Sequence, residues 1–282
     1  MRRVRLDALL SERGVFASRT RAAAAVLAGD VMLGAERRRA SKPGQLVDED
    51  VVVAVREAPA FVSRGGVKLS NALDAFGVVV DGRRCLDVGA STGGFTDCLL
   101  KRGASAVIAL DVAYGQLDWG LRRDPRVTVI ERSNARALEP SQLPYAPSLA
   151  VIDVSFISVC KVLPAVLGCM AGAGGTYDCL AMVKPQFEVG RAGVGKGGVV
   201  RDPALRRSAL QSVAAGAAAL GASVLGFASS GLPGPKGNRE TFAWLAEGGR
   251  AGALEPAAVA VAAQAAEPDD GDAQLAGREV AR

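Results

Sequence analysis

The sequence predicts an α/β protein, in which a mostly parallel sheet of seven strands is preceded by a small α+β module. Beyond Pro59, short apolar runs bounded by turn residues alternate with segments of helical character. Such strand–helix units need right-handed crossovers, so neighbouring strands run parallel and helices cover both faces. The length of 282 residues suits two domains, and 49% apolar residues are enough for a normal core.

The first part of the chain has its own pattern. A leucine stripe (Leu6, Leu9, Leu10) predicts a helix that Gly14 ends, and Ser18 is a suitable N-cap for a second helix over 19–28. Short strands are expected at 31–33 and 51–55, around a basic loop at 37–42. A module this small has a thin core, which favours docking to a partner or to nucleic acid.

The larger domain is expected to contain alternating elements. The expected helices are Thr96–Arg102, Gly115–Arg122 and Val159–Leu167. The expected strands are Arg84–Val88, Ala106–Asp111, Val127–Glu131, Leu149–Val154, Cys179–Lys184, Ser223–Ala228 and Thr241–Leu245. The turn-rich segment 231–237 joins the last two strands, so we expect an antiparallel strand at the edge of the sheet.

Composition excludes several classes of mechanism. Histidine is absent, which removes His-based triads, imidazole acid–base catalysis and His metal ligands, and no metal site is expected. The five cysteines form no CxxC pair, no signal peptide precedes them and no apolar run is long enough to span a membrane. We therefore expect a reduced, cytoplasmic protein. The alanine-rich segment 249–282 is acidic and lacks large apolar side chains, so it is expected to be disordered.

A glycine turn follows the first strand of the larger domain. In the segment CLDVGASTGGFT (85–96) a strand ends, small residues turn the chain and a helix begins, so a ligand can approach the backbone closely. Ser91 replaces the second glycine of a dinucleotide fingerprint. Asp87 before the turn suits a cationic amino-acid group, and Asp111 at the end of the next strand suits two ribose hydroxyls. This arrangement favours S-adenosylmethionine, with an ordinary turn or NAD as the alternatives.

A second glycine cluster at 190–197 nearly matches a phosphate-binding loop. Gly197 stands where that motif requires Ser or Thr, and Pro203 delays the following helix, so no helix N-terminus faces a phosphate. We exclude a nucleotide triphosphatase and expect a flexible loop that contacts substrate.

Four ionisable residues adjoin predicted element ends. Lys68 lies just before the first helix of the larger domain, Asp153 and Lys184 follow apolar strands, and Glu240 precedes the last strand. Because carboxyl ends of parallel strands line one crevice, the four side chains are expected to converge beside the glycine turn. Each alone fits a solvated surface charge, whereas the set indicates acid–base chemistry.

Several motifs together resemble the TlyA (haemolysin A-like) family. They are Ser63–Leu69, Asp87–Phe95, VIDVSFIS (151–158), VKPQFEVG (183–190) and LPGPKGNRETF (232–242), and the resemblance covers about residues 2–246. It implies a ribosomal-RNA 2′-O-methyltransferase with a Rossmann-like, FtsJ-type catalytic domain and an S4-like RNA-binding domain. The implied divisions are 1–57 (S4-like), 58–62 (linker), 63–248 (methyltransferase) and 249–282 (tail).

The resemblance also implies residue roles. The catalytic tetrad falls on Lys68, Asp153, Lys184 and Glu240. Lys184, uncharged at the moment of transfer, accepts or steers the proton of a ribose 2′-hydroxyl, and the two carboxylates position the lysines. Lys68 offsets charge that develops on the ribose oxygen. The expected S-adenosylmethionine-binding residues are Asp87, Gly89, Ala90, Ser91, Thr92, Gly93, Gly94, Phe95, Asp111 and Asn134.

The expected partner is ribosomal RNA or a ribosomal subunit. Residues 1–42 carry a net charge of +6, which together with the S4 resemblance favours contact with RNA phosphates. Two other classes stay open: a membrane-active haemolysin-like protein and a catalytically inactive ribosome-assembly factor. The family implies cytidine as the target, and the modified nucleotide and subunit are not fixed by the sequence. The expected RNA-binding residues are Arg3, Arg5, Arg19, Arg21 and Lys42.

Overall fold

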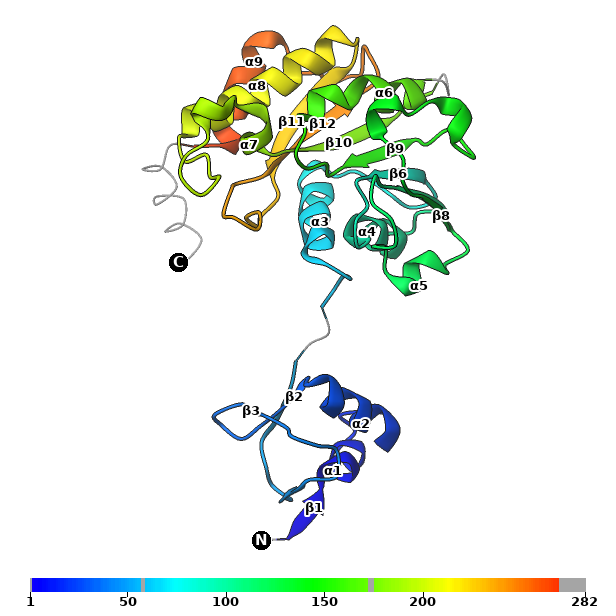
Figure 1. Ribbon diagram of the computed structural model, residues 1–282, viewed down its shortest axis with the longest axis vertical. Coiled ribbons are helices and arrows are strands. Elements are labelled where there is room, and N and C mark those ends of the chain that lie inside the picture. The colour runs from blue at the N-terminus through cyan, green and yellow to red at the C-terminus, as the bar shows by residue number, and fades with distance from the viewer. Residues whose placement is uncertain (1, 57–58, 172–174, 269–282) are drawn as a thin grey trace. The chain divides into compact units, whose positions relative to one another are not determined.

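The computed structural model describes residues 2–56, 59–171 and 175–268 (Figure 1). The chain divides into two compact units, Met1–Ala60 and Phe61–Arg282. The boundary between them falls inside the predicted linker at 58–62. Each unit has an apolar core of its own.

The N-terminal unit packs two helices against short strands. Leu6 and Leu10 of α1 (Leu6–Glu12) are fully buried, beside Val26 of α2 (Arg19–Ala28). Ser18 Oγ accepts the backbone N–H of Arg21, so the predicted N-cap of α2 is confirmed. Strand β2 (Val31–Leu33) pairs antiparallel with β3 (Arg38–Arg39) and β5 (Val53–Val55), and β1 (Arg3–Arg5) pairs with β4 (Leu46–Asp48). The strands β1, β3 and β4 were not predicted; β1 and β3 consist mostly of arginine and so lack the apolar run that marks a strand.

The second unit contains the predicted seven-stranded sheet. Its order within the described residues is β11-β12-β10-β9-β6-β7-β8, and neighbouring strands from β10 to β8 are parallel. Edge strand β11 pairs antiparallel with β12, whose direction is opposite to that of the other six. The strand bounds are β6 (Arg84–Val88), β7 (Ala106–Leu110), β8 (Val127–Ile130), β9 (Leu149–Ile152), β10 (Asp178–Val183), β11 (Ser223–Ser229) and β12 (Thr241–Ala246).

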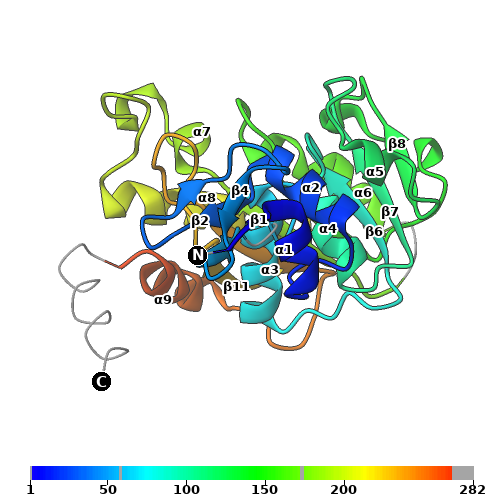
Figure 2. The same ribbon diagram turned by 90° about the horizontal axis from the view of Figure 1, so that it is seen from below.

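Helices cover both faces of this sheet, α3 and α4 on one and α6 and α8 on the other (Figure 1). Figures 1 and 2 both place α9 at the β11 end of the sheet and α5 at the β8 end. The helix bounds are α3 (Arg64–Phe76), α4 (Gly94–Lys101), α5 (Trp119–Arg122), α6 (Leu163–Ala171), α7 (Pro185–Glu188), α8 (Pro203–Ala219) and α9 (Pro256–Ala266). Short 3-10 turns lie at Ala135–Ala137, Pro140–Gln142, Val159–Lys161 and Arg191–Gly193.

Two helix predictions need correction. The helix expected over 115–122 is confined to α5, because Asp118 caps it by accepting the backbone N–H groups of Gly120 and Leu121. Lys68 lies inside α3 rather than before it. Gly66 lies in the first turn of this helix. A side chain there would collide with Phe61 and with the carbonyl oxygen of Gly94, so glycine is needed where the helix begins.

The prediction of a disordered segment over 249–282 is wrong for its described part, 249–268. This part contains α9, which packs on α8 and β11 with Ala263 fully buried. Small side chains let the helix approach its neighbours closely, so no stripe of large residues is needed. The remaining residues, 269–282, lie outside the described residues.

Candidate active site

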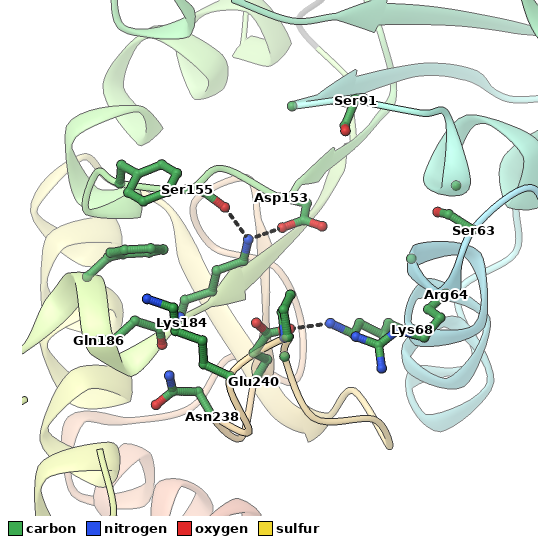
Figure 3. Close-up of a pocket in the computed structure, with 18 of the residues that line it drawn as sticks. Ser63, Arg64, Lys68, Ser91, Asp153, Ser155, Lys184, Gln186, Asn238 and Glu240 are labelled. Carbon is green, nitrogen blue, oxygen red and sulfur yellow. Dashed lines mark hydrogen bonds and ion pairs between the residues drawn. The ribbon is translucent and has the colours of Figure 1, made fainter. Parts of the chain in front are cut away.

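The four residues of the predicted tetrad line one cavity of about 770 Å³ (Figure 3). Lys68 Nζ lies 2.5 Å from Glu240 Oε2, and Lys184 Nζ lies 2.5 Å from Asp153 Oδ1. Figure 3 shows Lys184 directed toward Asp153 and Ser155, whose Oγ accepts a hydrogen bond of 2.8 Å from the lysine. The tetrad thus forms two ion pairs around a common space, which is called the tetrad cavity below.

Strand registers explain why these side chains meet. Strands β9 and β10 are parallel neighbours, and Asp153 and Lys184 follow them directly. Thr241, the first residue of β12, pairs with Val183 at the end of β10, so Glu240 arrives beside Lys184 from the opposite direction. Lys68 comes from the second turn of α3.

Burial makes both ion pairs obligatory. Lys68 is 6% exposed, Lys184 is 9% exposed and Glu240 is 2% exposed. A lysine this deep in the protein loses most of its hydration, and a partner carboxylate offsets that cost. The four groups are therefore held in fixed positions, ready for charge and proton chemistry.

The glycine turn forms the adjoining wall of the tetrad cavity. Of the ten residues expected to bind cofactor, six line this cavity: Gly89, Ala90, Ser91, Thr92, Gly94 and Phe95. Gly89 has a φ of +87° and lies so close to the carbonyl oxygen of Asp153 that a Cβ would collide with it. The turn and the strand end that carries Asp153 are thus locked together.

A second cavity of about 500 Å³, the turn cavity, lies on the β7 side of the turn. Asp111, at the end of β7, accepts hydrogen bonds of 2.7 Å from the backbone N–H groups of Ser91 and Ala113. Asn134 lines the same cavity, and its Oδ1 accepts the N–H of Arg136. The two cavities share Gly89, Ser91, Asp153, Ser155 and Phe156. A ligand in one cavity is therefore next to a ligand in the other.

Asp87 and Gly93, also expected to bind cofactor, line neither cavity. Asp87 is fully buried and accepts a hydrogen bond of 2.7 Å from Thr96 Oγ1. Burial raises the pKa of Asp87 to about 7. Gly93 caps α4 with a φ of +94°, where a Cβ would strike Leu117 and Leu121. Both residues support the turn from behind.

Sequence reasoning missed several residues that line the tetrad cavity. One of them is Phe156, which is 92% exposed and has a φ of +65°, an unusual conformation for an aromatic residue. Its ring centroid lies 5.4 Å from that of Phe187. Both rings lie within the motifs VIDVSFIS and VKPQFEVG, just after the ends of β9 and β10, and this position was the available signal. The other missed residues include Ser63, Arg64, Ser155, Gln186, Lys236 and Asn238.

The same two rings also line a third cavity of about 850 Å³, the basic cavity. Three cations from separate segments, Arg136, Lys161 and Arg191, line it, and none of the other lining residues that the structure describes is a carboxylate. Val194 of the second glycine cluster lines both the tetrad and the basic cavities. The aromatic pair therefore separates a polar reaction space from a positively charged one.

The five arginines and lysines expected to bind RNA are all exposed in the N-terminal unit. Asp7 organises two of them: Arg5 donates to both of its carboxylate oxygens, and Arg19 lies 3.4 Å away. These contacts lower the pKa of Asp7 to about 2. Arg3 donates to the carbonyl oxygen of Leu46. The remaining two, Arg21 and Lys42, are exposed on α2 and on the loop before β4.

Neither a membrane-spanning helix nor a metal-binding cluster is found in residues 2–56, 59–171 and 175–268. No helix there combines the length and apolar character that a membrane span requires. His, Cys, Asp and Glu side chains there form no group of three or more that could hold a metal ion.

Comparison with known proteins shows that this chain is similar to methyltransferases. The 16S/23S rRNA (cytidine-2′-O)-methyltransferase TlyA of Mycobacterium tuberculosis is 50% identical over 246 residues, which are 86% of this chain and 90% of that protein. The rRNA methyltransferase candidate YqxC of Bacillus subtilis is 47% identical over 192 residues, 67% of this chain and 66% of that protein.

A solved structure of a hemolysin candidate from Streptococcus thermophilus superposes with a TM-score of 0.71 at 37% identity. It covers 98% of this chain, and this chain covers 99% of it. The FtsJ-like methyltransferase family matches residues 61–247, the unit that holds the tetrad and the glycine turn. The chain therefore belongs to the FtsJ-like methyltransferase family.

Proposed function

We propose that this protein transfers a methyl group from S-adenosylmethionine to the 2′-hydroxyl of a cytidine in ribosomal RNA. The observation that carries the proposal is the meeting of the two ion pairs with the glycine turn in one cavity. The cytidine-2′-O-methyltransferase activity of the TlyA relative, which is similar to 86% of this chain, supports the choice of ribosomal cytidine. Ribosomal subunits as substrate also imply a cytoplasmic site of action.

The turn cavity has the features that S-adenosylmethionine requires. Asp111 supplies a carboxylate at a strand end, where its oxygens can accept hydrogen bonds from ribose hydroxyls. Asn134 adds a polar side chain to the same cavity. Gly89 and Ser91 leave the backbone open on the side shared with the tetrad cavity. When bound, this cofactor would supply an electrophilic methyl group.

The tetrad supplies the proton chemistry for the acceptor hydroxyl. Lys184 is the residue we assign to accept or steer the hydroxyl proton, and Ser155 helps to fix the position of its Nζ. Because Lys184 is an ammonium in the ion pair, it first passes its own proton to Asp153 and is uncharged at the moment of transfer. Lys68 is held by Glu240 and places positive charge where the ribose oxygen becomes more negative. Fixing both reactants for in-line displacement accounts for much of the acceleration, about 7–11 kcal/mol in favourable cases.

The basic cavity and the aromatic pair suit the RNA strand around the target nucleotide. Phe156 presents an almost fully exposed ring at the mouth of the tetrad cavity, where an unstacked base can pack. Arg136, Lys161 and Arg191 lie in the adjoining cavity, at a place suited to backbone phosphates. Target selection on this unit thus combines stacking with charge.

The N-terminal unit is the second RNA-binding element of the proposal, an S4-like domain. Its exposed cations Arg5 and Arg19 are oriented by one buried carboxylate, Asp7, which leaves them as a fixed pair. Fixed guanidinium groups suit recognition of the phosphates of a structured RNA.

Incubation of the full chain with labelled S-adenosylmethionine and purified 30S or 50S subunits tests the proposal. We expect label on a cytidine 2′-oxygen, located by mapping of ribose methylation, and none with Lys184→Ala. RNA binding without label would favour an inactive assembly factor. Leakage of liposomes without methylation would favour the haemolysin-like alternative.

A further inference from the structure

A buried cluster joins the C-terminal part of the second unit to the tetrad. It consists of Arg206 in α8, Thr241 in β12 and Glu267 just after α9, each 4% exposed or less. Arg206 Nε donates to Glu267 Oε2 at 2.8 Å, and Thr241 Oγ1 donates to Glu267 Oε1 at 2.7 Å. Both carboxylate oxygens of Glu267 are thus engaged by elements far away in the sequence.

The cluster reaches the tetrad through one peptide bond. Thr241 directly follows Glu240, the carboxylate that holds Lys68 at 2.5 Å. The carbonyl oxygen of Glu240 accepts the N–H of Ser230, which fixes the other side of this residue. Since Glu240 directly precedes β12, the hydrogen bond from Thr241 to Glu267 helps to hold the backbone of Glu240 in place.

Arg206 extends the same cluster to the loop beside the cavity. It donates to the carbonyl oxygen of Arg201 at 2.5 Å, and the N–H of the preceding Val200 donates to Asn238 Oδ1 at 2.9 Å. Asn238 Nδ2 in turn donates to the carbonyl oxygen of Gly198 at 2.7 Å. Both Asn238 and Gly198 line the tetrad cavity. Two walls of the cavity therefore depend on one buried ion pair.

We propose that Glu267 is a positioning residue for methyl transfer, acting through Thr241 on Glu240 and through Arg206 on the cavity loop. The inference rests on the methyl transfer proposed above. Glu267 lines neither the tetrad cavity nor the turn cavity. It therefore contributes to the rate by keeping the Lys68–Glu240 pair in the correct position relative to the Lys184–Asp153 pair. The end of α9, where Glu267 lies, thereby helps to position the residues of the tetrad.

The test uses Thr241→Val in the full chain, because Glu267→Ala would leave the buried charge of Arg206 without its partner and is expected to impair folding. Valine matches the shape of threonine and removes only the hydroxyl donor. We expect kcat to fall at least about tenfold, with KM for cofactor and subunits within about twofold of wild type. Thr241→Ser keeps the donor and is expected to restore kcat.

Two further variants separate positioning from stability. Glu267→Gln keeps an acceptor for Thr241 but removes the charge that pairs with Arg206, so we expect a lower melting temperature and an intermediate kcat. Glu255→Gln makes the same chemical change at the exposed N-cap of α9 and serves as the control, with wild-type kcat expected. Each kcat is measured well below the melting temperature of that variant.

The outcomes distinguish this inference from the proposed function. An active wild type together with wild-type kcat in Thr241→Val overturns the positioning role and leaves methyl transfer intact. A fall in kcat that Thr241→Ser does not reverse also overturns it. Absence of methylation in the wild type removes the proposed function itself, whatever the variants do.

Discussion

Lys184 Nζ lies 2.5 Å from Asp153 Oδ1, at the ends of two parallel strands that pair side by side. Ser155 Oγ accepts a second hydrogen bond from the same ammonium group. The lysine is almost completely buried and faces a cavity of about 770 Å³ that the glycine turn also lines. A buried cation is thus fixed at the boundary between the two spaces that the proposed reaction brings together.

Lys184→Ala removes the group assigned to the hydroxyl proton. We expect kcat for methylation to fall about 10²–10⁴-fold, the usual contribution of a general base, while cofactor affinity is retained. Initial-rate assays on ribosomal subunits and calorimetric binding of S-adenosylmethionine measure the two quantities. Lys101→Ala, at the exposed end of α4 and outside the three cavities, is the matched control. Near-normal turnover in Lys184→Ala would refute the assigned role.

Asp111→Ala tests the cofactor site. The substitution removes the acceptor of the backbone N–H groups of Ser91 and Ala113, and with it the carboxylate offered to ribose hydroxyls. We expect the Kd for S-adenosylmethionine to rise about 10–100-fold, in line with about 1–3 kcal/mol for unsatisfied polar groups. Calorimetry provides the measurement, with Asp124→Ala, which lies just after α5 and lines none of the three cavities, as control. Unchanged affinity would place the cofactor elsewhere.

The buried Asp87 makes stability depend on pH. Its pKa is raised by burial from an ordinary 3.8 to about 7, so between these values the folded state keeps a proton that the unfolded chain loses. Asp87 therefore contributes most to the free energy of unfolding at low pH. This contribution falls as the pH rises toward 7, by at most about 1.4 kcal/mol per pH unit.

Asp87→Asn keeps the shape of the side chain and removes the titration. The free energy of unfolding, measured with denaturant at several pH values, is expected to change less between pH 4 and 7 in this variant than in the wild type. This is the pH range between the ordinary pKa of an aspartate and the raised pKa of Asp87. An unchanged slope would mean that Asp87 is ionised in the folded protein.

Phe156→Ala tests stacking at the mouth of the cavity. Because the ring is 92% exposed, the melting temperature should hardly change. We expect KM for the RNA substrate to rise, since stacking of a base on an aromatic ring is worth about 1–3 kcal/mol. Phe156→Tyr should retain activity, and Trp119→Ala removes an exposed aromatic ring away from all three cavities as a control. Equal RNA affinity in Phe156→Ala and wild type would exclude stacking.

Paired substitution of Arg5 and Arg19 by alanine tests the N-terminal unit. Loss of two phosphate contacts should weaken RNA binding and reduce the slope of log K against log salt by about 0.7–0.9 per contact. Arg126→Ala, which removes an arginine paired with Asp124 in the second unit, should leave the slope unchanged. Filter binding across a salt series measures both, and an unaltered slope in the double variant would rule out these contacts.

The sequence allowed the sheet and the tetrad to be predicted because both follow local rules. Apolar runs marked the seven strands, and a charged residue at a strand end must lie near the crevice of a parallel sheet. The strand β3 was not predicted, since its two residues are too few to show an alternating pattern. Asp87 was expected at the ligand, although the pleat turns its side chain into the protein against Thr96.

The sequence by itself determined the α/β class, the position of the glycine turn and the identity of the four ionisable residues. Only the tertiary structure decided which lysine pairs with which carboxylate, because pairing depends on strand register and on the approach of α3. It also ordered the alanine-rich segment through Glu267, whose partners Arg206 and Thr241 are 61 and 26 residues away in the chain. A contact between distant segments leaves no local pattern, and so it appears only when the chain is folded.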